Sequence, residues 1–399
     1  MRNAEDTRLS AGATGAGGAD TDTDTGADKS RKIAAIGLLG LVSLIIIGLV
    51  LLDSGIRGAG LFVTGAGLGA LFFGFQYGFA SGWRRFLETG DTSAIATHFF
   101  LIFLCSLLFL TASLFGISAS GAFAPVSVSL VLGAFIFGIG MQLANGCGSG
   151  VLFSFGGGSS RMLVALPFFI IGSVIGSLWL PDALSWGSVN PVIIGGEGSD
   201  ITRIGFNLLL IGGVAGILFY TSYRRAIRLP VRLLTGSVCI AILCGVTFIL
   251  AGHPWGVTFG FTLWGAKLVQ AAGFDIASTE FWSWAGPARA LSHSVLADIS
   301  SLMNFGMLLG ASGLAIFSAR FGRYDVPPTS QLLAAAVGGV LMGLVARFAF
   351  GCNIGAFVGG IASGSLHGWV WFALALAGSW VGVKLRPYFG FELHRRASS

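Results

Sequence analysis

The sequence predicts an all-α polytopic membrane protein with about ten transmembrane helices, short re-entrant helices and two inverted-topology repeats. The first observation is composition: 54% of the 399 residues are hydrophobic, 10% are charged, and the mean hydropathy is +0.84. A soluble globular chain carries about 25% charged residues. The second and third observations are ten long apolar runs and a repeated Gly-Cys motif. Together they exclude a cytosolic globular enzyme, a disordered protein and a fibrous protein.

The first 30 residues differ from the rest of the chain. They are rich in Gly, Ala, Thr and Asp, and they lack apolar residues that could anchor them to a fold. We therefore expect residues 1–30 to form a disordered cytoplasmic tail. The run 33–52 that follows is long enough to span a bilayer, and no A-x-A cleavage site follows it. It therefore predicts an additional transmembrane helix within 31–57, not a signal peptide.

The remaining apolar runs divide the chain into two halves. We expect a first half over 58–203, connecting helices over 204–252, a second half over 253–390 and a cytoplasmic tail over 391–399. The ten predicted spans are 33–52, 59–80, 97–115, 125–144, 162–180, 204–222, 232–251, 290–318, 331–350 and 367–386.

The basic residues between these runs predict their orientation, because Lys and Arg favour cytoplasmic loops. Lys29, Arg31 and Lys32 place the N-terminus inside. Arg84, Arg85, Arg161 and the basic loop 224–232 then also fall inside, and the acidic loop 181–203, with Asp182, Glu197 and Asp200, falls outside. Whether the segment 255–272 spans the membrane decides the orientation of the rest of the chain. If it enters and returns, then Arg320, Arg323 and the pair Arg395 and Arg396 also fall inside, so we expect it to be re-entrant.

Two stretches of the chain form an internal repeat: GIGMQLANGCGSG, ending at Gly150, and GLVARFAFGCNIG, ending at Gly355. Counted from the cysteine, both have Gly at −9, −1 and +3. A Gly-Ser pair and a further Gly follow each stretch. A fainter pair, Gly78-Phe79 and Gly260-Phe261, precedes each motif. Because Cys147 follows a helix that ends inside and Cys352 one that ends outside, the repeats are inverted, an architecture that places binding sites near the midplane of transporters.

The repeated motif suggests an anion pathway. Gly146 and Gly351 let the backbone bend and a solute approach. A half-helix beginning at Cys147 or Cys352 would turn its free N–H groups toward a pore, and helix N-termini attract anions. A thiol adds a soft S–H donor, which suits a sulfur-bearing anion better than a metal ion. The alternative is that each cysteine is a small apolar filler. We expect that role for the remaining cysteines, Cys105, Cys239 and Cys244.

Polar and charged residues near the motifs are further candidates, because intramembrane charges are costly and usually functional. Lys267 or Arg289 could draw an anion inward or neutralise Asp298, which we place one turn into an apolar helix. Arg347 precedes Cys352 by five residues, where the first repeat has Gln142, and it could instead anchor a membrane end.

Asn145 and Asn353 flank the cysteines, where they could offer amide donors or cap short helices. A nucleophilic pair of His367 with Cys352 is also conceivable, although no acid is placed to orient it.

The residues GMQLANGCGSGVLFSFGGGSSRMLVALPFF, PWGVTFGFTLWGAKLVQ and ARFAFGCNIGAFVGGIASGSLHGWVWFALALAGSWVGVKLRP resemble the YeeE/YedE sulfur-transport family, over about 58–390. The resemblance implies an inner-membrane permease with re-entrant helices around a narrow pore. It implies uptake of thiosulfate or a related sulfur anion through hydrogen bonds to thiols, with Cys147 and Cys352 as two of the family's pore cysteines. Ala80 stands about where a third is often found, so a different sulfur or selenium species is an alternative.

Further expectations concern partners and activity. The resemblance makes a small sulfur-carrier protein of the TusA type a plausible partner. The net charge of +6 comes from residues between apolar runs and not from a basic stripe, so we expect no nucleic-acid partner. No cofactor or metal motif is visible and there is no CxxC pair. We therefore expect no enzymatic activity, and a membrane enzyme with a cysteine nucleophile is the less favoured alternative, as is a transporter or channel for another small anion.

Overall fold

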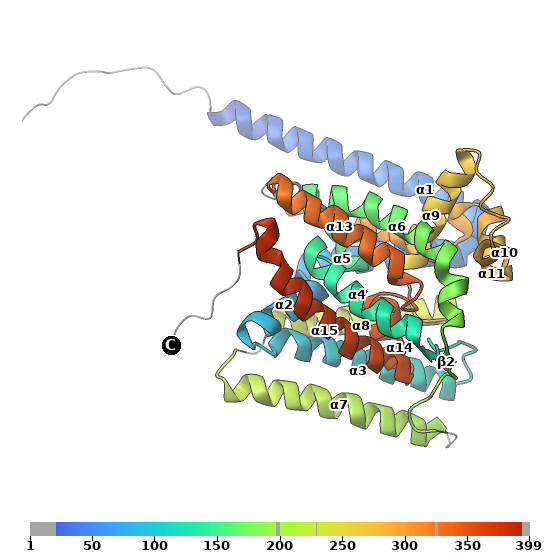
Figure 1. Ribbon diagram of the computed structural model, residues 1–399. Helices are drawn as coiled ribbons and strands as arrows, with labels where there is room; N and C mark the ends of the chain where they lie inside the picture. Colours follow the sequence, from blue (N-terminus) through green and yellow to red (C-terminus); the bar gives the residue numbers. More distant parts are fainter. Residues whose placement is uncertain (1–20, 197–199, 229, 324–325, 393–399) are drawn as a thin grey trace, which may run out of the picture.

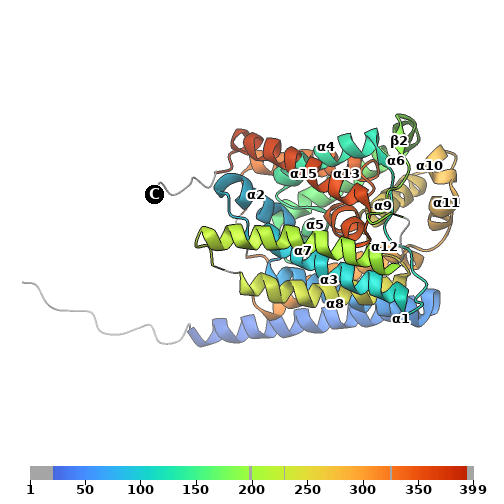
Figure 2. The same ribbon diagram turned by 90° about the horizontal axis from the view of Figure 1, so that it is seen from below.

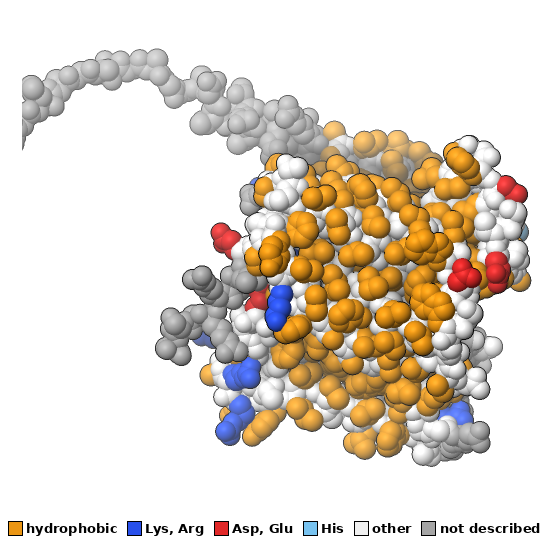
Figure 3. All heavy atoms as spheres, in the orientation of Figure 1, with side chains coloured by type: hydrophobic (Ala, Val, Ile, Leu, Met, Phe, Trp, Pro, Cys, Tyr) orange, Lys and Arg blue, Asp and Glu red, His pale blue; other side chains and the backbone are white. Residues whose placement is uncertain are grey.

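The computed structural model describes residues 21–196, 200–228, 230–323 and 326–392, with side chains from residue 33 onward. It confirms the predicted all-α membrane class: nine helical stretches of this part of the chain are long and apolar enough to cross a bilayer. Most of the helices run roughly side by side (Figures 1 and 2). On the face in Figure 3, a broad hydrophobic surface separates Lys and Arg, mostly at one end, from Asp and Glu, mostly at the other.

The elements are α1 (Thr21–Phe75), α2 (Phe79–Thr89), α3 (Ser93–Leu114), β1 (Val126–Ser127), α4 (Val128–Ala144), α5 (Gly148–Gly156), α6 (Ser160–Ser185), β2 (Ser188–Val189), α7 (Asp200–Arg224), α8 (Val231–Ala251), α9 (Thr258–Ala271), α10 (Glu280–Ser283), α11 (Ala285–Ser292), η1 (Val295–Ala297), α12 (Ile299–Phe317), α13 (Thr329–Ala346), η2 (Asn353–Gly359), α14 (Gly360–Ala362), α15 (Leu366–Leu385) and η3 (Arg386–Phe389). Strands β1 and β2 form one short antiparallel ladder.

Helix α1 contains the first two predicted spans. Gly55 breaks it with φ 66° and ψ −165°, a conformation that glycine adopts readily. The segment 56–75 then runs antiparallel to α8, because Gly60 lies against Leu250 whereas Phe75 lies against Gly236. Of the predicted disordered tail, residues 1–20 lie outside the described residues and 21–30 belong to α1.

The two halves of the chain have inverted topology, as predicted. Equivalent helices α4 and α13 are antiparallel: Gly133 lies against Ala349, and Gly338 lies against Ala144. The halves also exchange partners, since α4 packs on α15 while α13 packs on α6. Small residues allow this close approach, because a methyl group added at Gly378 would come within 1.8 Å of the Phe135 carbonyl oxygen.

The predicted re-entrant segment 255–272 is confirmed as α9. Helix α8 ends beside Arg57, which donates hydrogen bonds to the carbonyls of Leu250 and Ala251. The chain before α12 returns to the same end, where Ser54 Oγ donates to the Leu296 carbonyl at 3.0 Å. Because α8 ends and α12 begins at one end of the molecule, the helix between them enters and returns.

Two predicted spans have wrong boundaries. The span 290–318 is interrupted: residues 285–292 belong to α11, and α12 begins only after Asp298, whose carboxylate accepts the Ser301 N–H at 2.7 Å. Asp298 is therefore a helix N-cap and does not lie one turn inside the helix. The span 59–80 ends at Phe75, because Gln76 takes φ 54° and Gly78 precedes a separate short helix, α2.

Candidate functional site

The two repeat cysteines meet in the interior. Cys147 immediately precedes α5 and Cys352 immediately precedes η2, both with extended backbone, and each side chain is 1% exposed. A methyl group added at Gly148 would lie 3.3 Å from Cys352 Sγ, so the first residue of one short helix faces the sulfur at the start of the other. Cys147 Sγ lies 3.4 Å from Ser149 Oγ. Because the halves are inverted, both short helices begin at this shared centre.

The sharp turn before each cysteine has a left-handed residue two positions before the cysteine in both repeats, Asn145 with φ 64° and Phe350 with φ 54°. The second repeat adds Gly351, whose φ of 139° strongly favours glycine. At the equivalent position Gly146 does not have a positive φ. Asn145 ends α4, and its N–H donates to the Met141 carbonyl. The sequence correctly predicted a turn at each motif, but only Gly351 requires glycine for its backbone angle.

The two asparagines have unlike surroundings. Asn353 is fully buried beside Cys352, and neither its Nδ2 nor its Oδ1 has a hydrogen-bond partner in the described part of the chain. Asn145 Oδ1 instead accepts from Arg84 Nη1 at 2.6 Å and Arg386 Nη1 at 3.3 Å. Leaving a buried amide unpaired costs about 1–3 kcal/mol. The unpaired Asn353 side chain therefore suggests that a polar partner binds here.

Helix α9 also begins beside this centre. Thr258, the first residue of α9, places its Cγ2 3.7 Å from the methyl position at Gly148. Just before α9, Gly256 Cα lies 3.9 Å from the position of a methyl group added at Gly355. Near the start of α2, the Ala80 carbonyl accepts from Gln142 Nε2 at 3.2 Å. Ala80, where the third cysteine was expected from the resemblance, is thus buried against α4.

Arg347 contacts the start of α9 and lines two cavities. Its Nη2 donates to Thr258 Oγ1 at 2.9 Å, its guanidinium lies 5.6 Å from the Phe259 ring centre, and its buried Nε has no partner among the described residues. Arg347 lines both a cavity of about 940 Å³ and a second of about 370 Å³. The sequence left anchoring and function open for Arg347, and its position in the lining of both cavities favours function.

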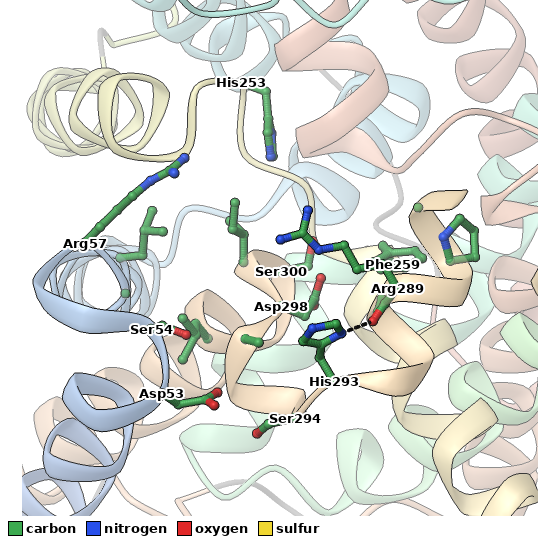
Figure 4. Close-up of a pocket in the computed structure, with 18 of the residues that line it drawn as sticks. Asp53, Ser54, Arg57, His253, Phe259, Arg289, His293, Ser294, Asp298 and Ser300 are labelled. Atoms are coloured by element: carbon green, nitrogen blue, oxygen red, sulfur yellow. Dashed lines mark hydrogen bonds between the residues drawn. The ribbon is translucent and has the colours of Figure 1, made fainter. Parts of the chain in front are cut away.

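The larger cavity carries several basic groups (Figure 4). Arg57 enters it from α1, His253 from the loop before α9, and Arg289 and His293 from the region of α11. No sequence pattern indicated Arg57, His253 or His293, because residues this far apart in the chain form no motif. Their proximity follows only from the break at Gly55 and the return of α9.

The predicted charge pair of Arg289 and Asp298 does not form an ion pair within 4.0 Å in the described structure. Both residues line the larger cavity, but Asp298 caps α12. Lys267 lies at the far end of α9, where its Nζ donates to the carbonyls of Leu291 at 2.5 Å and His293 at 2.7 Å. Lys267 therefore links α9 to the C-terminal end of α11, and it does not line either of these two cavities.

The remaining sequence candidates lie apart from the cysteine centre. His367 Nδ1 lies 2.7 Å from Ser365 Oγ, and no hydrogen bond joins His367 to Cys352 in the described part of the chain. Cys105 and Cys244 are buried on α3 and α8, and Cys239 is half-buried. These locations give no support to a Cys/His nucleophile.

Comparison with known proteins identifies the family. The family model described as "Sulphur transport" matches residues 76–381, which include α2, α5, α9, η2 and both cysteine motifs. The chain belongs to this family. Over 155 residues it is 35% identical to the "Probable transporter YedE" of Escherichia coli (strain K12), covering 38% of this chain and 37% of that protein. It thus spans little more than a third of the length of that relative.

A second relative matches over a longer stretch. The chain is 27% identical over 320 residues to the "Thiosulfate transporter TsuA" of Spirochaeta thermophila, covering 76% of this chain and 91% of that protein. The TsuA of Escherichia coli (strain K12) is 26% identical over 269 residues, covering 64% and 75%. The chain is therefore a multi-pass membrane protein that belongs to a sulphur-transport family. The relatives given above are named as transporters, not as enzymes.

Proposed function

We propose that the protein takes up a small inorganic sulfur oxyanion, thiosulfate or a close relative, through a pathway centred on Cys147 and Cys352. The observation that carries the proposal is Asn353, a fully buried amide with both polar atoms unpaired beside Cys352. A permeating oxyanion would accept from its Nδ2 and from the free N–H groups at the start of α5 and η2. The relatives named thiosulfate transporters support this choice of anion.

The larger cavity supplies the entry for the anion. Arg57, Arg289 and Arg347 line it together with two histidines, so its field attracts anions. Asp53 and Asp298 offset part of that charge. From this cavity, Arg347 and Thr258 lead to the start of α9, which lies beside Gly148. An anion reaching Arg347 would thus meet the cysteine centre next.

The thiols act as hydrogen-bond donors and form no covalent bond with the anion. A neutral S–H donates weakly, so it can hold an oxyanion and release it again. Two such donors at the starts of opposed half-helices would pass the anion from Cys352 to Cys147. With Ala80 in place of a third cysteine, the relay has two members.

The orientation follows the charge distribution. The end of the bundle with Arg84, Arg161 and Arg225 faces the cytoplasm by the positive-inside rule, and the large cavity then opens outward. In this orientation the protein lies in the inner membrane with both termini on the cytoplasmic side. A TusA-type sulfur-carrier protein on the cytoplasmic side remains a predicted partner for the delivered sulfur.

The test is uptake of radiolabelled thiosulfate, sulfite and sulfate into proteoliposomes, with protein-free liposomes as the baseline. We expect saturable uptake of at least one of these anions, recovered chemically unchanged inside the vesicles. The double variant Cys147→Ala, Cys352→Ala should lose it, whereas the matched variant Cys105→Ala, Cys244→Ala should keep it. Chemical conversion of the anion, or normal uptake by the first double variant at equal protein content, would refute the proposal.

A further inference from the structure

Three arginines gather at the end of the molecule opposite the large cavity. Arg84 comes from α2, Arg161 from the start of α6 and Arg386 from the start of η3. Arg84 Nη1 and Arg386 Nη1 both donate to one oxygen, Asn145 Oδ1, at 2.6 and 3.3 Å. Arg161 and Arg386 share the ring of Phe391, with distances of 5.0 and 3.9 Å from guanidinium carbon to ring centre. We call these three residues the arginine cluster.

The positive charge of the arginine cluster is poorly compensated. Two guanidinium groups share a neutral amide oxygen where a carboxylate would be expected. Glu88 is the nearby acid, but neither of its carboxylate oxygens has a hydrogen-bond partner in the described structure. The salt bridge on this helix belongs to the neighbour Arg85, whose Nη1 lies 3.7 Å from Asp91. Arg386 is buried and the other two arginines are half-buried. Cations removed from water without a close counter-ion are unfavourable, so this arrangement is suited to an added anion.

Two unpaired guanidinium N–H donors also indicate an anion site. Arg386 is 5% exposed, and its Nε has no partner within the described chain. The Nε of Arg161 is likewise buried and unpaired. Guanidinium groups bind tetrahedral oxyanions through pairs of parallel N–H donors, which is the arrangement that free Nε groups allow. An oxyanion here would satisfy these donors and reduce the repulsion among the three arginines.

We propose that the arginine cluster is a second anion site, which receives the sulfur oxyanion after it leaves the cysteine centre. Asn145 connects the two sites, because it lies two residues before Cys147 and contacts Arg84 and Arg386. This role rests on the proposed function. The ligand class is a small oxyanion with two negative charges, such as thiosulfate or sulfate.

The binding test is thermal unfolding of the purified protein in detergent, titrated with sodium thiosulfate or sodium sulfate against sodium chloride at equal ionic strength. We expect either oxyanion to raise the melting temperature of the wild-type protein. Arg386→Gln and Arg84→Gln should each lose most of this rise, whereas Arg85→Gln should keep it. Absence of a rise in the wild-type protein, or equal rises in all variants, overturns the site. Arg84→Gln keeps the test decisive if Arg386→Gln does not fold.

Uptake measurements separate this inference from the proposed function. Arg386→Gln should lower the maximal uptake rate at least tenfold and change the half-saturating external concentration less than twofold, because the entry cavity is untouched. If the wild-type protein transports no sulfur anion but the melting shifts follow the arginines, the proposed function fails and the anion site stands. If the wild-type protein transports and Arg386→Gln and Arg84→Gln transport equally well, the second site is wrong.

Discussion

Gly148→Ala should block transport while leaving the fold intact. The added methyl group would lie 3.3 Å from Cys352 Sγ and 3.7 Å from Thr258 Cγ2, directly between the starts of α5, η2 and α9. The sulfur must yield by a few tenths of an ångström, and overpacking of this kind typically costs about 1–3 kcal/mol. Alanine in place of glycine in a helix gains up to about 1 kcal/mol. We therefore expect the free energy of unfolding to fall by about 2 kcal/mol or less.

The transport effect should be much larger, because the methyl group occupies space that a permeating anion needs beside Cys352. Initial uptake of labelled thiosulfate into proteoliposomes should fall at least about tenfold, which corresponds to about 1.4 kcal/mol in the barrier. The melting temperature should remain within a few degrees of wild type. Wild-type uptake by Gly148→Ala at equal reconstitution would show that the anion does not pass between these helix starts.

Gly156→Ala, in the same helix, supplies the matched control. A methyl group at Gly156 would lie 2.6 Å from the Leu308 carbonyl oxygen, a distance that real contacts of this kind do not reach. Helix α5 must then shift against α12, so this variant should lose about 1–3 kcal/mol of stability. Its effect on transport should follow the loss of folded protein. The pair separates a block of the pathway from a packing defect.

Three more predictions test the pathway and its orientation. Arg347→Gln should raise the half-saturating thiosulfate concentration several-fold. Arg289→Gln, at the exposed rim of the cavity, should have a smaller effect that disappears in high salt. Equal effects of the two variants would show that Arg347 has no particular role in anion entry. Asn353→Leu should fold with equal or greater stability, because it removes an unpaired buried amide, yet lose uptake; retained uptake would show that the amide serves another purpose. A reporter in the loop between α9 and α10 should be accessible from outside the cell, and a cytoplasmic signal there would reverse the proposed orientation.

Much of the fold could be predicted because membrane helices are encoded locally. Length and hydropathy located the spans, and counting basic residues in loops identified α9 as re-entrant. The repeat predicted that Cys147 and Cys352 occupy equivalent places, and the structure brings both to one buried centre. Helix boundaries were less predictable where polar residues interrupt an apolar run. Asp298 was assigned to a helix interior, although acidic residues are more stable as N-caps.

The surroundings of the site depended on tertiary structure that no local pattern encodes. Lys267 was a reasonable candidate as a lone intramembrane cation, but α9 is long enough to carry it about 13 Å from the first residue of that helix. There it binds two backbone carbonyls. Conversely, Arg57 and His253 gave no signal in the sequence, since each reaches the cavity through a chain reversal.

The inverted repeat duplicates the cysteines but not the charges around them. At five residues before the cysteine, the second half has Arg347 and the first half has neutral Gln142. Near the first motif the cations come from outside the repeated motif, from Arg84 and Arg386. In the proposed path an anion therefore meets guanidinium groups at both ends and weak, neutral donors at the centre. Conduction requires binding that is strong enough for entry and weak enough for release, so thiols at the narrowest point suit passage better than a third group of arginines would.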